Sequence, residues 1–126
     1  MAKIMVVDDD KQASTFIAEV VEMEGHEAIV VNESSKAVQT AHSTHPDLFL
    51  LDLMMPEPDG FKLCRMLRKD RNFMQTPILI VTALDNIDSK IVAIGAGAND
   101  YLTKPFHIND LSTKIKTLLD KAKAKR

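Results

Sequence analysis

The chain has 126 residues, of which 45% are hydrophobic and 27% are charged, and its formal net charge is −2. This is the size and composition of one globular domain with an ordinary hydrophobic core, and the charge argues against a general nucleic-acid binder, which would carry a basic excess. The single cysteine, Cys64, excludes an internal disulfide and a cysteine-based metal cluster. No secretory signal is visible and no apolar run reaches the ~18 residues of a membrane span, so we expect a cytoplasmic protein that does not associate with membranes.

The first third of the chain predicts a strand, a helix and a second strand. Residues 4–7 are apolar and rich in β-branched side chains, which is typical of a buried strand. Apolar side chains then recur at helical spacing, at Ala13, Phe16, Ile17, Val20 and Val21. These positions share one face of a helix, and Gly25 is suited to end that helix as the residue after its C-cap. Residues 28–31 predict the second strand.

The middle of the chain repeats this alternation. Ser34 and Ser35 are predicted N-caps of a helix that runs to about Thr44. Residues 48–51 form a third buried apolar run, and a loop rich in proline and glycine follows it. The next helical face is marked by Leu63, Cys64 and Leu67.

The last third predicts two more strands, each followed by a helix. Residues 78–81 and 101–103 are the fourth and fifth strands. The helix between them is marked by Ile87, Ile91 and Ile94 and ends near Gly95 and Gly97. The final helix is marked by Leu111, Ile115, Leu118 and Leu119. Residues 120–126 are basic, and two interpretations stay open: a solvated helix end or the beginning of a linker.

Five strands and five helices in strict alternation predict an α/β fold. Continuous apolar strands indicate a sheet covered on both faces, and right-handed crossovers then give a doubly wound parallel sheet of the flavodoxin-like class. Five such units leave no room for a second domain, so residues 1–126 are predicted to form a single domain.

Polar residues that follow the strands are predicted to meet at one edge, because ligands of open parallel sheets bind outside the carboxyl ends of the strands. The first strand is followed by three aspartates, and the third, fourth and fifth strands each deliver one polar side chain. The set is Asp8, Asp9, Asp10, Asp52, Thr82 and Lys104.

The charges of this set indicate phosphoryl chemistry. Two carboxylates at ~4 Å repel by about 4 kcal/mol, so the aspartates need a cation, and Mg²⁺ is a hard ion that combines one or two carboxylates with phosphate oxygens. Lys104 and Thr82 are suited to meet an anionic phosphoryl group. Asp52 is the candidate nucleophile that forms an acyl phosphate, and Asp8 and Asp9 are the candidate metal-holding residues.

Four segments of the chain together resemble the receiver domain of response regulators. They read Ile-Met-Val-Val-Asp-Asp at 4–9, Asp-Leu-Met-Met-Pro-Glu-Pro-Asp-Gly at 52–60, Ile-Val-Thr-Ala at 80–83 and Ala-Asn-Asp-Tyr-Leu-Thr-Lys-Pro-Phe at 98–106. The resemblance covers essentially the whole chain, in order, and it implies the strand order 2-1-3-4-5.

The resemblance also implies roles for the acidic residues. Asp52 matches the residue that receives a phosphoryl group from the phosphohistidine of a sensor histidine kinase or phosphotransfer protein. Asp9 matches the direct Mg²⁺ ligand, and Asp8 matches the acid that holds the ion through water. Met54 matches the position whose backbone carbonyl binds the metal.

The remaining matched residues concern the phosphoryl group and the response to it. Thr82 and Lys104 match residues that contact the phosphoryl oxygens. Tyr101 matches the aromatic residue that swings inward when the threonine moves, and Pro105 matches a position that usually follows a cis peptide bond. The implied output surface is the face of the fourth helix, fifth strand and fifth helix, which would contact a downstream protein.

Three details of this chain refine that expectation. Met54 and Leu84 are apolar where the family varies, and neither side chain can hydrogen-bond an attacking water, so we expect slow self-dephosphorylation. Asn99 stands where many members carry an acid, which weakens the case for a charge-paired dimer face. We expect no enzymatic activity beyond the domain's own phosphorylation and dephosphorylation, and no direct contact with nucleic acid.

Other functions fit the sequence less well. A flavodoxin-like carrier needs a phosphate loop where the three aspartates stand, and a nucleotide hydrolase needs a P-loop that is absent. A phosphatase of the aspartyl-phosphate type usually has a second aspartate where Met54 stands. The serious alternative is a binding module that uses the receiver fold without phosphorylation.

Overall fold

The computed structural model describes residues 1–124, and within them five parallel strands form one sheet in the order β2-β1-β3-β4-β5. The strands are β1 (Lys3–Val7), β2 (Glu27–Val31), β3 (Leu48–Leu51), β4 (Ile78–Thr82) and β5 (Asp100–Thr103). The predicted fold class, strand order and strand positions are confirmed.

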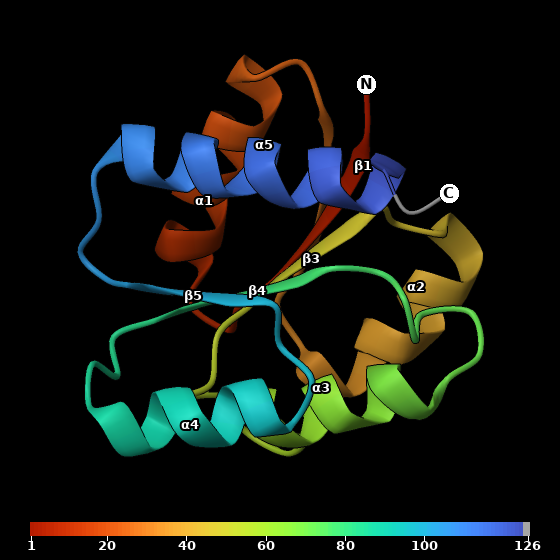
Figure 1. The fold of residues 1–126 in the computed structure, drawn as a ribbon, viewed down its shortest axis with the longest axis vertical. Coiled ribbons are helices and arrows are strands. Elements are labelled where there is room, and N and C mark those ends of the chain that lie inside the picture. The colour runs from red at the N-terminus through yellow and green to blue at the C-terminus, as the bar shows by residue number, and fades with distance from the viewer. Residues whose placement is uncertain (125–126) are drawn as a thin grey trace.

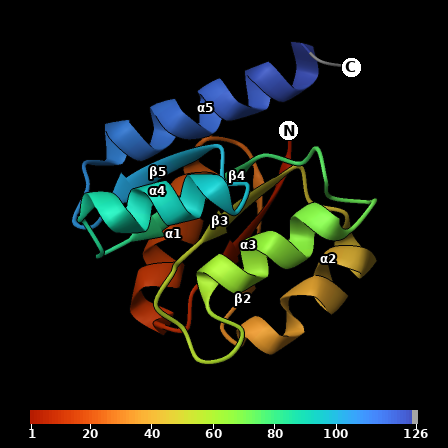
Figure 2. The ribbon, with the colours of Figure 1, turned by 60° about the horizontal axis from the view of Figure 1, so that its bottom comes forward.

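The helices cover both faces of the sheet, as Figure 1 shows. They are α1 (Lys11–Met23), α2 (Ala37–Thr44), α3 (Gly60–Lys69), α4 (Ile87–Gly95) and α5 (Ile108–Ala124). Helices α1 and α5 lie on one face, and α2, α3 and α4 lie on the other, an arrangement that is also visible in Figure 2. Each face has its own core of buried apolar side chains, because successive residues of a strand point to opposite sides. None of the helices in residues 1–124 is both long and apolar enough to cross a membrane.

The backbone hydrogen bonds of the sheet continue one residue beyond the strand ends, which fixes the residues at its carboxyl edge. The Asp8 amide donates to the Val31 carbonyl at 3.1 Å, and the Asp52 amide donates to the Val7 carbonyl at 3.0 Å. At the other side of the sheet, the Lys104 amide donates to the Thr82 carbonyl at 2.8 Å. The backbones of Asp8, Asp52 and Lys104 are therefore held by the ladder itself.

Helix α1 largely follows its sequence pattern. Ile17, Val20 and Val21 are buried, and Gly25 adopts a φ of 87° after the helix end, as expected for its C-terminal position. Phe16 differs, because 43% of its surface is exposed and its ring instead approaches Phe106, with 6.0 Å between the ring centroids.

The predicted serine caps of α2 are wrong. Residues 34–36 form a 3₁₀ turn, and Lys36, without a side-chain hydrogen bond, occupies the N-cap of α2. The Ser34 hydroxyl donates to the carbonyl oxygen of Pro56 at 2.9 Å instead. That bond joins the 3₁₀ turn before α2 to the loop after β3, and rules based on local capping do not predict a contact between such distant residues.

Helix α4 exists where it was predicted, but its isoleucines face solvent. Ile87, Ile91 and Ile94 are 71%, 63% and 49% exposed, and Ala93 is the buried residue of this helix. The core beneath α4 is filled by small alanines and by the Tyr101 ring, so the larger side chains of the helix lie outside it.

The C-terminal segment is helical as far as the structure describes it. Helix α5 continues to Ala124, which agrees with a solvated helix end for most of the basic stretch 120–126. Residues 125–126 lie outside the described residues.

Candidate functional site

Asp8 is a buried carboxylate at the end of β1, with only 2% of its surface exposed. Its Oδ1 accepts a hydrogen bond from the Asp10 amide at 2.9 Å. Its carbonyl oxygen accepts from the Asn32 side-chain amide at 2.8 Å, and Asn32 also donates to the Ser14 hydroxyl at 2.9 Å. Backbone and side chain of Asp8 are thus both held in place, and the side chain cannot turn away without breaking these bonds.

The three consecutive aspartates have three different environments. Asp10 is the N-cap of α1, and its carboxylate accepts from the amides of Gln12 and Ala13 at 3.0 and 3.3 Å, as N-cap side chains do. Asp9 is exposed and lines a cavity of about 230 Å³ beside the loop after β2. Asp8 is the one that enters the buried site.

Asp52 reaches the same site from the end of β3 and is 8% exposed. Its Oδ1 accepts from the Met54 amide at 3.1 Å, and its Oδ2 lies 3.2 Å from the Lys104 ammonium. The Met54 side chain itself points outward and is 56% exposed. The Asp52 carboxylate is therefore oriented by the backbone that follows it and by a lysine from another strand.

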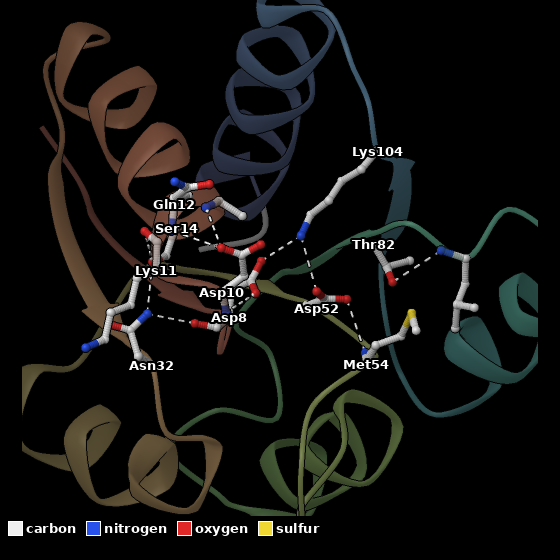
Figure 3. Close-up of polar contacts among 12 residues, drawn as sticks. Asp8, Asp10, Lys11, Gln12, Ser14, Asn32, Asp52, Met54, Thr82 and Lys104 are labelled. Carbon is white, nitrogen blue, oxygen red and sulfur yellow. Dashed lines mark hydrogen bonds and ion pairs between the residues drawn. The ribbon is translucent and has the colours of Figure 1, made fainter.

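Lys104 bridges the two buried carboxylates. Its Nζ lies 2.7 Å from Asp8 Oδ2 and 3.2 Å from Asp52 Oδ2, and Figure 3 shows the side chain reaching from the end of β5 to both acids. Burial raises the pKa of Asp8 above its ordinary value, although the hydrogen bond from Lys104 opposes that shift. Burial alone would lower the pKa of Lys104, but the hydrogen bond to Asp8 and the charge of Asp52 outweigh it and raise that pKa. The lysine is thus held in its charged form.

Thr82 and Tyr101 both contact the backbone of Leu84, in the loop after β4. Thr82 is fully buried, and its hydroxyl accepts from the Leu84 amide at 3.5 Å. The Tyr101 hydroxyl donates to the Leu84 carbonyl at 2.6 Å. Tyr101 is 8% exposed, and the Lys90 ammonium lies over its ring, 5.7 Å from the ring centroid. Burial, and then the negative charges of Asp52 and Asp85, raise the pKa of Tyr101.

The structure brings most of the predicted site residues to one edge. Asp8, Asp52 and Lys104 are in direct contact and Thr82 ends the neighbouring strand, while Asp9 lies outside this contact. The predicted cis peptide before Pro105 is present, and a second one precedes Pro58. The sequence interpretation missed Asn32, although it follows β2 directly and the rule that selected the other residues would have found it.

The donor set of this edge fits Mg²⁺. In residues 1–124, no three histidine, cysteine, aspartate or glutamate side chains gather closely enough to form a metal site by themselves. The carboxylates of Asp8 and Asp52 nevertheless meet at one cation, the Lys104 ammonium. Mg²⁺ requires only one or two carboxylates, because it keeps several waters and takes phosphate oxygens as its other ligands. Asp9, in the loop after β1, and the Met54 carbonyl, in the loop after β3, are further oxygen donors beside these two acids.

A parallel sheet in this strand order, with two buried acids and a lysine at its carboxyl edge, defines a flavodoxin-like domain built around an acidic site. A family model described as the response regulator receiver domain matches residues 4–116. The chain therefore belongs to the response regulator receiver family, the signalling domain of two-component systems.

Known relatives agree with this membership. The chain is 38% identical over 119 residues to the DNA-binding dual master transcriptional regulator RpaA of Synechocystis, a match that covers 94% of this chain and 49% of that protein. It is 35% identical over 117 residues to the alkaline phosphatase synthesis transcriptional regulatory protein PhoP of Bacillus subtilis, covering 93% and 48%. The chain thus spans about half the length of these curated relatives.

Solved structures show the same fold. The CheY-like response regulator receiver domain protein from Methanospirillum hungatei superposes with a TM-score of 0.92 at 25% identity, over 100% of this chain and 99% of that one. The BeF3-activated N-terminal receiver domain of RstA from Klebsiella pneumoniae superposes with a TM-score of 0.87 at 33% identity, over 93% and 97%.

Proposed function

We propose that Asp52 accepts a phosphoryl group from the phosphohistidine of a sensor histidine kinase or phosphotransfer protein. The observation that carries this proposal is the buried contact of Asp52 with Lys104, 3.2 Å apart at the carboxyl edge of the sheet, in a chain of the receiver family. An Asp52 carboxylate oxygen attacks phosphorus in line, the P–N bond of the phosphohistidine breaks, and its electron pair returns to the imidazole nitrogen. The product is an acyl phosphate.

The other residues at this edge of the sheet orient the reacting groups and neutralise their negative charge. These two effects account for most of the catalysis in phosphoryl transfer. The Lys104 ammonium receives the phosphoryl oxygens and the Thr82 hydroxyl donates a hydrogen bond to them. Asp9, Asp52 and the Met54 carbonyl would hold Mg²⁺, with Asp8 acting through water. When bound, this ion neutralises the charge that accumulates between the carboxylate and the phosphoryl oxygens.

The output surface follows from the exposed isoleucines of α4. Ile87, Ile91 and Ile94 recur at helical spacing and form an exposed apolar stripe, and such patches mark protein interaction sites. We assign this stripe to the face of α4, β5 and α5 that contacts a downstream protein. The domain itself is expected to act without touching nucleic acid, even though RpaA of Synechocystis, which is about twice its length, is described as DNA-binding.

A small phosphodonor tests the phosphoacceptor directly. The chain is incubated with acetyl phosphate and MgCl₂, and its intact mass is recorded. We expect the addition of one phosphoryl group, which is absent after Mg²⁺ chelation and absent in Asp52→Asn. Labelling that persists in Asp52→Asn would assign the phosphoryl group to another residue.

The same experiment separates this function from a phosphorylation-independent binding module. Such a module would take up no label from acetyl phosphate or from a phosphorylated kinase domain while it stays folded by circular dichroism. The contact of Asp8, Asp52 and Lys104 favours phosphorylation, because a module without this chemistry has no use for two buried acids.

A further inference from the structure

Two successive methionines in the loop after β3 have opposite environments. Met54 is 56% exposed, whereas Met55 is 9% exposed and belongs to the core on the face of α2, α3 and α4. The Met54 amide donates to Asp52 Oδ1 at 3.1 Å, and Figure 3 shows the residue beside that carboxylate. The thioether of Met54 is therefore open to solvent, while its backbone is bonded to the residue proposed to carry the phosphoryl group.

Exposed thioethers are the sulfur atoms of this chain that an oxidant can reach. The single cysteine, Cys64, is fully buried, and burial raises the pKa of its thiol, which disfavours the reactive thiolate. A peroxide oxidises a thioether to a sulfoxide and so converts an apolar side chain into a polar one. Sulfur donates an electron pair to one peroxide oxygen, the O–O bond breaks, and the second oxygen leaves as water with both peroxide protons.

We propose that oxidation of Met54 to its sulfoxide by a peroxide shortens the lifetime of the phosphoryl group on Asp52. This inference rests on the proposed function. A thioether is a weak hydrogen-bond acceptor, whereas the sulfoxide oxygen is polar and can orient a water beside the acyl phosphate. That water attacks phosphorus, and the P–O bond to Asp52 breaks. Its electron pair returns to the carboxylate, and the water proton passes to the released phosphate.

The oxidation changes the side chain of Met54 and leaves its backbone as it is. The amide that orients Asp52 and the carbonyl proposed for the metal are therefore both retained. Methionine sulfoxide reductases reverse the reaction: two thiols are oxidised to a disulfide, and the sulfoxide oxygen leaves as water. Met54 is thus a reversible device by which an oxidant shortens the phosphorylated state without acting on the kinase.

Oxidation resolved by residue tests the first step. The 126-residue chain is treated with hydrogen peroxide, and the sulfoxide at each methionine is quantified by mass spectrometry of its peptides. We expect Met54 to be oxidised together with Met74, which is 52% exposed in the segment before β4, while Met55 and the fully buried Met5 stay reduced. Protection of Met54 equal to that of Met55 would overturn the proposal.

The lifetime of the label tests the second step. Each protein is oxidised, freed of peroxide, labelled with acetyl phosphate and MgCl₂, and followed after removal of the phosphodonor. We expect oxidation to shorten the lifetime in the wild type about two- to tenfold, which is the range that one added hydrogen bond provides. Treatment with methionine sulfoxide reductases and dithiothreitol should restore the original lifetime.

Two variants assign the response to one sulfur atom. Met54→Leu has no sulfur at this position, so its lifetime should be the same before and after peroxide treatment. Met74→Leu removes a thioether of similar exposure far from Asp52 in the sequence, so its lifetime should respond to peroxide as that of the wild type does.

The outcomes distinguish this proposal from the function on which it rests. A lifetime that is unchanged or longer after oxidation overturns the proposal, as does a response that persists in Met54→Leu or an oxidised chain that accepts no label. Each of these results leaves phosphorylation of Asp52 in the reduced chain standing. If the reduced chain itself takes up no label, the proposed function fails and the proposal fails with it.

Discussion

Gly60 packs directly against the backbone carbonyl oxygen of Asp52. A Cβ atom at this position would collide with that oxygen and would lie 2.6 Å from the Cα of Leu53, while the Gly60 amide donates to the Leu53 carbonyl at 3.1 Å. The first residue of α3 thus touches the main chain of the proposed phosphoacceptor, and only a hydrogen atom fits between them.

The substitution Gly60→Ala should therefore be costly. Because the neighbouring atoms are backbone and cannot step aside, we expect a loss of about 1–3 kcal/mol or more in the free energy of unfolding, measured by urea denaturation. We also expect slower labelling of Asp52 by acetyl phosphate, since the collision shifts the carboxylate. The matched control is Gly95→Ala in α4, where no atom would meet the added Cβ; it should leave stability unchanged or raise it by up to about 1 kcal/mol. Equal effects of the two substitutions would contradict this account.

Tyr101 gives a pH-dependent signal that can be read without interference, because the chain has one tyrosine and no tryptophan. Its pKa in the folded protein is raised, mainly by burial, so folding favours the neutral phenol. The contribution of the Tyr101 phenol to the free energy of unfolding is complete below the ordinary tyrosine pKa of about 10. It is lost as the pH rises through the higher pKa of the folded protein. Phenolate absorbance should thus appear at higher pH in the native chain than in urea. Coincident titration curves would place the ring in water.

The apolar residues beside the phosphoacceptor should prolong the phosphorylated state. Met54 and Leu84 offer no hydrogen bond to an attacking water, and Met54 is exposed enough to be replaced without disturbing the core. We expect Met54→Asn to shorten the phosphoryl lifetime several-fold, up to roughly the 10²-fold that a positioned acid–base group contributes, measured by loss of label after removal of the phosphodonor. A lifetime that is unchanged or longer in Met54→Asn would refute the explanation.

Arg68 joins the C-terminal end of α3 to the segments that precede β4 and β5, at the edge of the sheet opposite to the site. Its guanidinium donates to the carbonyl oxygens of Gly97, Phe73 and Thr76 and to the side chain of Asn99, at 2.6–2.9 Å. Lysine cannot reproduce this fork of donors, so Arg68→Lys should lower the free energy of unfolding by about 2–4 kcal/mol.

The comparison for Arg68 is Arg65→Lys, one turn earlier on the same helix, where the side chain is exposed. That change should alter stability by less than about 0.5 kcal/mol. If both variants unfold at the same urea concentration, the four hydrogen bonds of Arg68 contribute nothing that a lysine lacks.

The three central strands, β1, β3 and β4, could be predicted because they are buried on both faces and therefore consist of continuous apolar runs. Which side chains of the helices pack against the sheet could not be predicted in the same way. Periodicity shows that Ile87, Ile91 and Ile94 share a face of α4, and that Phe16 belongs to the apolar face of α1. It does not show which of these side chains are packed against the sheet. In α4 the side chain that meets the core is the small Ala93, which carries almost no hydrophobic signal.

The site was predictable to the extent that it follows the ends of the strands. Asp8, Asp52 and Lys104 meet as the topology requires, since the hydrogen-bond ladder fixes their backbones. Side-chain direction was not predictable, because it depends on local bonds that only the folded chain makes: Asp10 turns to cap α1, which leaves Asp9 facing outward. The cation that satisfies the buried acids was also identified only in part, since Lys104 was assigned to an anion and is found on two carboxylates.

The shallow anchoring of α4 affects how this domain can diverge. A helix that gives the core little more than Ala93 leaves its exposed positions, such as Ile87, Ile91 and Ile94, weakly constrained by folding. Mutations at these exposed positions can accumulate in a lineage without unfolding the protein, so duplicated copies of such a domain can acquire new binding partners while the residues at the carboxyl edge of the sheet stay the same.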